Sequence, residues 1–149
     1  MDPDEKAVRC GEVMSRGDDA ARELGIRLKE IRPGQAVMDM EITASMANGN
    51  DVCHGGLLFT LADTAMAFAS NSRDECYVAV SASIEFLAPA HLGDRITALA
   101  TEEHRAGRTA TYSVAVTDAA GERVAQLLGR TYRVSGSLIE DEEEQPKPT

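Results

Sequence analysis

Asp63 is the residue whose position is hardest to explain without a chemical role. It lies within an apolar segment, Leu57 to Ala69, that follows helical spacing and is followed by no basic residue until Arg73. An ionised carboxylate among apolar side chains is costly unless a charged or hydrogen-bonding group meets it. Two interpretations are open here: a catalytic carboxylate, or an aspartate that bonds to nearby backbone or faces a solvent-filled gap.

The start of the same predicted helix, His54-Gly55-Gly56, is a second candidate site. Glycines let a ligand or another backbone approach closely. The first turn of a helix leaves backbone N–H groups unpaired at the positive end of the helix dipole. Such groups can stabilise a developing oxyanion, although a plain glycine-rich helix start would look the same.

Three polar residues near this helix start allow several roles. His54 could act as a general base, or it could orient the substrate or cap the helix. Cys53 adjoins it, so a Cys-His nucleophile is a further alternative. Asn48 lies in the loop 47–51, where its amide could position a water or a substrate carbonyl, or form a turn with Gly49.

The spacing between the two candidate sites has a consequence for assembly. Asp63 follows Gly55 by eight residues, which is roughly 12 Å along a helix. A carboxylate and an N–H group that far apart cannot easily act on one carbonyl carbon. If both are catalytic, the helix start of one subunit meets Asp63 of another, and two antiparallel helices about a two-fold axis give two equal sites. We therefore predict a dimer with shared active sites.

The rest of the chain supplies the elements that hold these residues. Helical spacing predicts a helix over residues 4–24, interrupted at Gly17, and a buried helix over residues 56–71. Alternating apolar residues predict strands over residues 26–31, 37–43, 78–87, 95–101, 109–117 and 124–134. Short turns join the last four strands, which therefore pair antiparallel. One antiparallel sheet with one central helix is an α+β fold.

Composition limits the class of protein. A chain of 149 residues with 43% hydrophobic and 27% charged residues fits one globular domain, which we place at residues 1–136. The net charge of −10 argues against nucleic acid as a partner, because phosphate binding needs a basic face. The apolar stretch around Asp63 is too short to span a membrane, and the acidic N-terminus is unlike a signal peptide. We expect a cytoplasmic protein.

Two further expectations concern the chain end and the cysteines. Residues 137–149 contain an acidic run at positions 140–144 and two prolines, which predicts a disordered tail. Cys10, Cys53 and Cys76 show no metal-ligand spacing, so no metal site is expected at them. No cofactor is expected either.

The segment from Asn48-Gly49 through Cys53-His54-Gly55-Gly56 to Ala62-Asp63-Thr64-Ala65 resembles the PaaI-type thioesterases of the hotdog fold. Ser83–Pro89 and Arg105–Tyr112 are similar as well, and the resemblance covers about residues 18–136. It implies an antiparallel sheet wrapped around one long helix, dimers that join their sheets edge to edge, and pairing of dimers into homotetramers. The substrates that it implies are acyl-CoA thioesters, in particular phenylacetyl-CoA and its hydroxylated relatives from phenylacetate degradation.

The resemblance also assigns roles by position. Asp63 matches the catalytic carboxylate, as general base or as nucleophile. Gly55 matches the glycine near the thioester oxygen, and His54 and Asn48 match the polar residues that flank the thioester. A hydroxyl that some relatives carry near the start of the next strand has no clear counterpart, since Ala79 falls near that position, with Ser81 and Ser83 beyond it.

Arginines are the candidates for binding the CoA phosphates, because the guanidinium fork matches phosphate geometry. The sequence offers Arg105, Arg108 and Arg133, with Arg130 as a fourth. The alternative is that these arginines only balance an acidic surface.

Two other functions stay open. A hotdog hydratase or dehydratase would pair a catalytic histidine with an acidic residue, whereas His91 and His104 both fall in predicted turns. A non-catalytic acyl-CoA-binding protein of the sensor type would carry a DNA-binding helical unit, and residues 1–24 are too short and too acidic for one.

Overall fold

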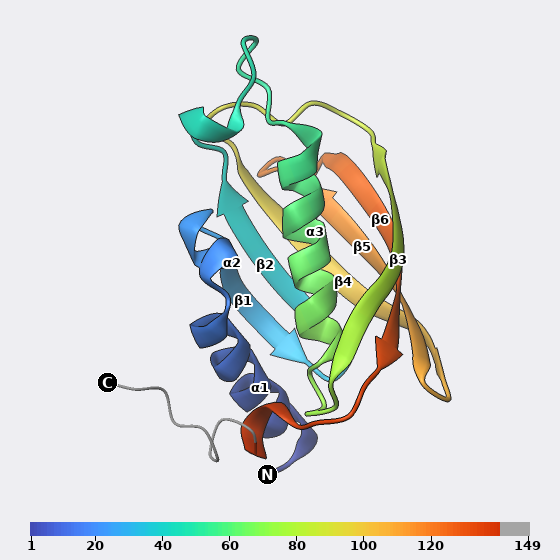
Figure 1. Ribbon diagram of the computed structural model, residues 1–149. Helices are drawn as coiled ribbons and strands as arrows, with labels where there is room; N and C mark the ends of the chain where they lie inside the picture. Colours follow the sequence, from blue (N-terminus) through green and yellow to red (C-terminus); the bar gives the residue numbers. More distant parts are fainter. Residues whose placement is uncertain (141–149) are drawn as a thin grey trace.

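The computed structural model describes residues 1–140 of the chain. Within them, six strands form one antiparallel sheet in the order β1-β2-β4-β5-β6-β3. The strands are β1 (Arg27–Arg32), β2 (Gln35–Glu41), β3 (Tyr77–Phe86), β4 (Arg95–Ala106), β5 (Thr109–Thr117) and β6 (Arg123–Arg133). Figure 1 shows the sheet curving around the long helix α3 (Gly55–Ser70). This is the α+β arrangement that the alternating residues predict.

Helix α3 is central because most of its side chains are apolar and small. One side of it packs on the concave face of the sheet, through the buried residues Leu61, Ala62, Ala65, Met66 and Ala69. The sheet meets it with alternate buried residues, among them Met40, Ile96, Val114 and Leu127. The other side faces outward and carries a stripe of half-buried residues: Thr60, Asp63, Thr64 and Ala67. The fold therefore presents Asp63 at the surface of its central helix.

Buried polar contacts fix the C-terminal end of α3 to the sheet. The Ser70 hydroxyl donates to Thr131 Oγ1 at 2.8 Å. Just beyond the helix, Arg73 Nη1 donates to Glu102 Oε2 at 2.7 Å, and the buried Tyr112 hydroxyl donates to the same oxygen at 3.0 Å. Burial alone would raise the pKa of Glu102, but these two hydrogen bonds hold it below its usual range. The helix is thus held in one position along the sheet.

The N-terminal helical segment consists of two helices that lie along β1 (Figure 1). Helix α1 (Pro3–Gly17) begins with a capping box in which Asp2 and Glu5 bond each other's backbone N–H groups. It ends at Gly17, and Asp18 then caps α2 (Asp19–Glu23) by accepting from the Ala21 N–H group. A short 3-10 helix, Ala44–Met46, follows β2.

The structure differs from the sequence prediction at the chain end. Residues 137–140 are not a disordered tail: the Ser137 hydroxyl and the Ile139 N–H group both bond the Asp74 carboxylate, at 2.7 and 3.0 Å. Ile139 is buried, with 7% of its surface exposed. The acidic composition of this segment gave no indication that Ile139 is buried. The remainder of the predicted tail, residues 141–149, lies outside the described residues.

Candidate active site

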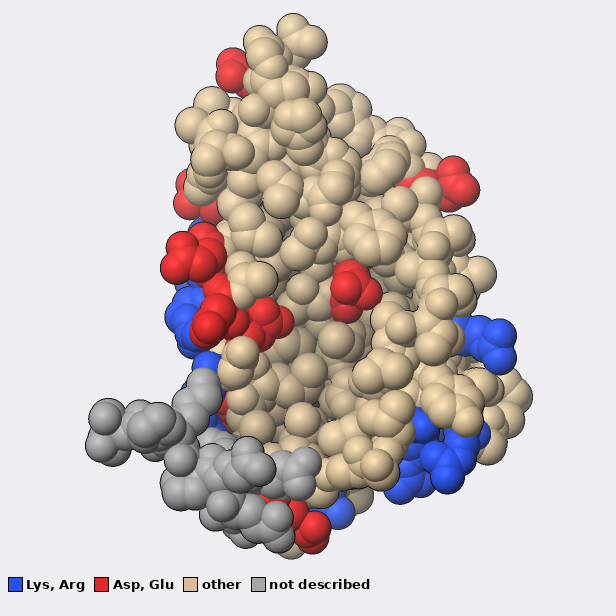
Figure 2. All heavy atoms as spheres, in the orientation of Figure 1, with Lys and Arg blue, Asp and Glu red and all other residues tan. Residues whose placement is uncertain are grey.

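Asp63 is half-buried on the outward stripe of α3. Within residues 1–140 its carboxylate has no hydrogen-bond or ion-pair partner. Burial raises the pKa of this carboxyl above its usual value. Figure 2 shows an isolated acidic group over α3 in a broad face that is otherwise without charge, and Asp63 is the one acidic residue of that helix. An unpaired carboxylate in such a place is free to bond a water or a substrate.

The start of α3 offers two free backbone donors. His54 is the N-cap residue, but its side chain makes no capping hydrogen bond, so the proposed capping role is wrong for the imidazole. Leu57 N–H donates to the His54 carbonyl at 3.0 Å. In the described part of the chain, the N–H groups of Gly55 and Gly56 have no acceptor. They are donors at the positive end of the helix dipole.

Cys53 is not arranged as a nucleophile beside His54. Its side chain is buried, and Sγ donates to the backbone carbonyl of His54 at 3.4 Å. Burial raises the pKa of the thiol, whereas a nucleophilic cysteine needs a lowered pKa. The structure therefore argues against the Cys-His alternative.

The loop between Ala47 and Cys53 projects beyond the start of α3, at the top of Figure 1, and a β-bridge between these two residues closes it. Asn48 directly follows that bridge, and its N–H group donates to the Val52 carbonyl at 2.8 Å. Its Oδ1 accepts from the N–H groups of Asn50, at 2.9 Å, and Val52, at 3.2 Å. Asp51, between them, has a left-handed backbone with φ 58°. The amide oxygen of Asn48 thus builds the loop, and the amide NH₂ of this exposed residue makes no bond within residues 1–140. Both interpretations of Asn48, as a turn residue and as a donor, fit this geometry.

A single chain does not bring these groups together. Asp63 and Gly55 lie on one helix, eight residues apart, so the separation of roughly 12 Å expected from helix geometry stands. Neither His54 nor Asn48 bonds Asp63. We call the Asp63 carboxylate and the helix-start donors the two half-sites, because one chain does not join them.

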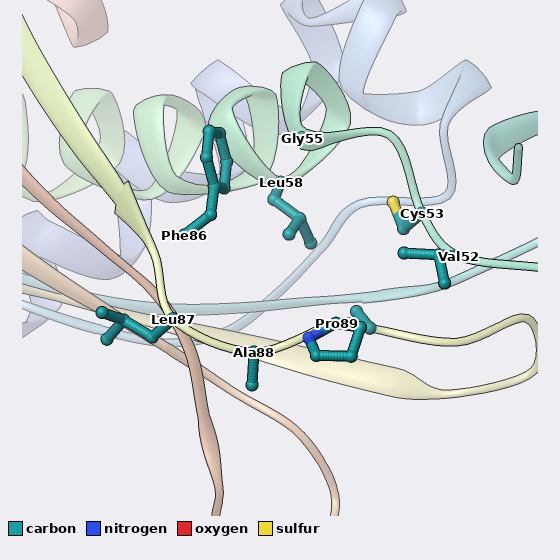
Figure 3. A pocket seen from close by; sticks show the side chains of 9 residues that line it. Val52, Cys53, Gly55, Leu58, Phe86, Leu87, Ala88 and Pro89 are labelled. Atoms are coloured by element: carbon teal, nitrogen blue, oxygen red, sulfur yellow. The ribbon is translucent and has the colours of Figure 1, made fainter.

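A cleft of about 490 Å³ adjoins the helix start, between α3, the loop before it and the end of β3. Phe86, at the end of β3, packs directly on Gly55: a Cβ added to that glycine would lie 2.7 Å from the ring atom Cζ. Figure 3 shows the Phe86 ring beside the first turn of α3, with Leu58 over the cleft. The amino-acid sequence does not single out Phe86, because a linear pattern does not report a contact between residues so far apart in the chain.

The predicted phosphate-binding arginines gather at one end of the sheet. Arg105 and Arg133 share Glu75, with N···O distances of 3.6 and 3.8 Å. Arg108 Nη1 donates to the Arg133 carbonyl at 3.4 Å. Figure 2 shows basic side chains collected near the β4–β5 turn, at the lower right. We call these three residues the arginine cluster: Arg105, Arg108 and Arg133.

The serines of β3 do not replace the missing hydroxyl. Ala82 pairs with Gly129, and a Cβ on Gly129 would meet Met66 of α3, so Ala82 faces the helix. Ser81 and Ser83 therefore point to the opposite face of the sheet. There they line a hollow together with Arg130, which stands apart from the arginine cluster.

Two further observations concern other kinds of site. Among residues 1–140, no group of three or more His, Cys, Asp or Glu residues is placed to hold a metal ion. Over the same span, no helix has both the length and the apolar character needed to cross a membrane.

Comparison with known proteins identifies the family. Residues 50–125 match the family described as the thioesterase superfamily. The chain is 38% identical over 133 residues to acyl-coenzyme A thioesterase PaaI of Escherichia coli strain K12, covering 89% of this chain and 95% of that protein. It is 31% identical over 118 residues to human acyl-coenzyme A thioesterase 13, covering 76% and 84% of the two chains. The chain belongs to the thioesterase superfamily.

Solved structures agree with this assignment. The E. coli PaaI protein from the phenylacetic acid degradation operon superimposes with a TM-score of 0.89 at 38% identity, over 91% of this chain and 98% of that one. The TT0310 protein of Thermus thermophilus gives a TM-score of 0.75 at 38% identity, over 78% and 98%. The resemblance to PaaI-type thioesterases and the hotdog fold are thereby confirmed.

Proposed function

We propose that this chain hydrolyses acyl-CoA thioesters to the free acid and CoA, with Asp63 as the catalytic carboxylate. The observation that carries the proposal is the unpaired, half-buried Asp63 carboxylate, with its raised pKa, on the outward stripe of the central helix. A half-buried, unpaired carboxylate with a raised pKa can act as a general base or as a nucleophile. Relatives that bear the name acyl-coenzyme A thioesterase support the substrate class.

The chemistry follows from the two half-sites. The N–H groups of Gly55 and Gly56 hold the thioester oxygen and stabilise the negative charge that develops on it. Asp63 either takes a proton from the attacking water or attacks the carbonyl carbon itself, to form an anhydride that water then cleaves. In both routes the C–S bond breaks and the sulfur leaves with CoA. The amide NH₂ of Asn48 and the imidazole of His54 orient the thioester.

A dimer completes the site in this proposal. Strand β3 is at the edge of the sheet, and two of its apolar side chains are exposed: 48% of Val78 and 55% of Val80. An exposed apolar edge strand is suited to pairing with a second copy. Joining two β3 edges about a two-fold axis sets the two α3 helices side by side and antiparallel, so that Asp63 of one faces Gly55 of the other. Pairing of such dimers into tetramers remains a prediction.

The same arrangement places the arginine cluster. If Gly55 of one copy faces Asp63 of its partner, the end of the partner's α3 lies beside the first copy's loop 47–53. The partner's arginine cluster, two of whose members hold Glu75 just after that helix end, then lies on the side from which CoA would enter. Arginine forks bind phosphate bidentately.

The acyl group that we expect is phenylacetyl or a hydroxylated phenylacetyl group. Support comes from the relatedness to E. coli PaaI, whose structure is described as from the phenylacetic acid degradation operon. A cytoplasmic location likewise stays a prediction.

Release of free thiol from a panel of acyl-CoA esters tests the proposal. The wild-type protein should release CoA from phenylacetyl-CoA, and Asp63→Asn should lose about 10²-fold to 10⁴-fold in kcat, with unchanged circular dichroism and CoA binding. Thr64→Ser, which keeps a hydroxyl next to Asp63, is the matched control and should stay active. CoA binding without hydrolysis of any ester would instead favour an acyl-CoA-binding protein.

A hydratase finds less support in the structure. His91 lies in an exposed turn, bridged to Val52 on the backbone, and His104 is exposed on β4. The His91 backbone N–H group donates to Asp94 Oδ2 at 2.9 Å, but in the described part of the chain neither imidazole bonds an acidic side chain. The pair of imidazole and carboxylate that this chemistry needs is therefore not formed there.

A further inference from the structure

Phe86 is a large aromatic residue with 55% of its surface exposed, although its ring packs against the start of α3. Its atoms Cζ, Cε1 and Cε2 would lie 2.7, 2.9 and 3.2 Å from a Cβ on Gly55. The ring therefore occupies the space that any larger residue at position 55 would need. One side of Phe86 packs on the helix start, and the rest is open to whatever occupies the neighbouring cleft.

The side chains that line the cleft beside Phe86 are almost all apolar, although backbone polar atoms also reach its surface. Its side chains come from the helix start, the preceding loop and the β3–β4 connection, and they are Val52, Cys53, Leu58, Phe86, Leu87, Ala88, Pro89 and Ala90, with Gly55 at the edge. None of these residues is charged. The one polar side chain, Cys53, already donates to the His54 carbonyl. Such a lining favours a hydrocarbon group.

The cleft lies next to the position that the reacting carbonyl group would occupy. Gly55 lines the cleft, and its N–H group has no acceptor within residues 1–140. A thioester oxygen bound at this N–H would bring the attached acyl carbon chain to the mouth of the cleft. Phe86 lines the same cleft, and its ring lies against Gly55 (Figure 3). A chain that passes from the helix start into the cleft therefore contacts this ring.

We propose that this cleft binds the acyl group of the substrate and that Phe86 determines which acyl length it accepts. The inference rests on the proposed function, because it assigns the acyl group of the same thioester. A smaller residue at position 86 leaves more room in the cleft for the acyl chain, and a larger residue leaves less. Each methylene gained or lost in a hydrophobic pocket changes discrimination by about 10-fold to 200-fold in kcat/KM.

The test is the profile of kcat/KM against acyl length, from acetyl-CoA to decanoyl-CoA, for Phe86→Ala and Phe86→Trp. We expect Phe86→Ala to move the optimum to longer acyl chains. The ratio of kcat/KM for long acyl-CoA esters to that for short ones should rise by at least about tenfold. Phe86→Trp should move it in the opposite direction. Val8→Ala removes part of an exposed apolar side chain on α1 (49% exposed), far from the cleft, and should leave the profile unchanged. If Phe86→Ala does not fold, Phe86→Leu takes its place.

A merely structural role for Phe86 would lower kcat/KM by one factor at every acyl length, and that result overturns the inference. Non-hydrolysable thioether analogues of the same acyl-CoA series separate this failure from failure of the proposed function. Should wild-type protein hydrolyse no ester, the proposed function fails. The length dependence of analogue binding, in wild type against Phe86→Ala, still decides whether Phe86 faces the acyl group.

Discussion

At the scale of single residues, Asp63 is the feature on which the proposal depends. The apolar residues around it in sequence made it conspicuous, and the structure adds that burial raises its pKa while no neighbour in residues 1–140 compensates its charge. Residues placed in this way at active sites lower the stability of the fold. The cost of holding Asp63 ionised can therefore be measured.

The first prediction is that Asp63→Asn stabilises the protein at neutral pH. A carboxyl whose pKa is raised by folding favours the fold when protonated, below its unfolded pKa of about 3.9, and loses that contribution as pH rises through the folded pKa. At pH 7 the ionised group is a cost that asparagine removes. Urea unfolding should show a higher midpoint for Asp63→Asn at pH 7, and the gain should shrink toward pH 3. An equal gain at both pH values would contradict this account.

The sequence singles out Asp63 because a carboxylate interrupts an apolar helical pattern, and Gly55 and Asn48 because they lie at and just before the start of that helix. Their catalytic roles come from the resemblance to PaaI-type thioesterases and stay predictions. The sequence could not identify Phe86, since an aromatic residue at the end of a strand is ordinary and its contact with Gly55 exists only in three dimensions. It also left open whether His54 caps the helix. Side-chain direction decides that question, and a linear pattern does not contain it.

At the scale of elements, the start of α3 is fixed by the packing of Phe86 on Gly55. The second prediction is that Gly55→Ala costs about 1–3 kcal/mol of unfolding free energy, because the added Cβ forces the ring away. The double variant Gly55→Ala/Phe86→Ala should regain part of that loss. Gly56→Ala is the control, since its Cβ would meet no atom within 4 Å, and it should be neutral or slightly stabilising. Thermal or urea unfolding of the wild type, the two single variants and the double variant measures the coupling between the two residues. If the double variant loses the sum of the two single losses in unfolding free energy, the residues are not coupled.

The ends of β4 and β6 carry the third prediction, which concerns the arginine cluster. Arg108→Ala and Arg133→Ala should each raise KM for acyl-CoA by about tenfold, because a charge-assisted contact to phosphate is worth about 1.5–3 kcal/mol. Neither variant should change KM for the matching acyl N-acetylcysteamine thioester, which lacks the nucleotide. Arg130→Ala, on the other face of the sheet, should leave both values unchanged. Equal effects on the two thioesters would mean that the cluster supports the fold and does not bind phosphate.

The elements themselves were largely predictable, since strand and helix periods differ clearly in this chain. Strand β4 runs to Ala106, beyond the predicted end at residue 101, because its charged second half pairs with β5 outside the core and lacks apolar alternation. The burial of Ile139 was also not predicted, for a different reason. A single buried apolar residue in an acidic segment has no period to detect.

At the scale of the whole molecule, the outward face of α3 and the β3 edge form one nearly uncharged surface, although the chain carries a net charge of −10 (Figure 2). Exposed apolar surface of this kind marks an interaction site. In the proposed dimer a second copy of the chain covers this surface, because each half-site lacks what the other holds. No arrangement of one rigid α3 can close the gap between Gly55 and Asp63.

Mixed dimers test this most directly. Substitutions at Gly55 displace Phe86, so the helix-start variant of choice is Asn48→Asp, which keeps the oxygen that accepts from Asn50 and Val52 and removes the NH₂ donor. Differently tagged Asp63→Asn and Asn48→Asp chains are co-expressed, and the heterodimer is isolated through both tags. Each homodimer should be nearly inactive.

In the heterodimer, one of the two sites combines the intact Asn48 of one chain with the intact Asp63 of the other. Thiol release from phenylacetyl-CoA should therefore recover to about half of the wild-type kcat per dimer. A heterodimer no more active than the two parent homodimers would contradict a site shared between two copies of this chain.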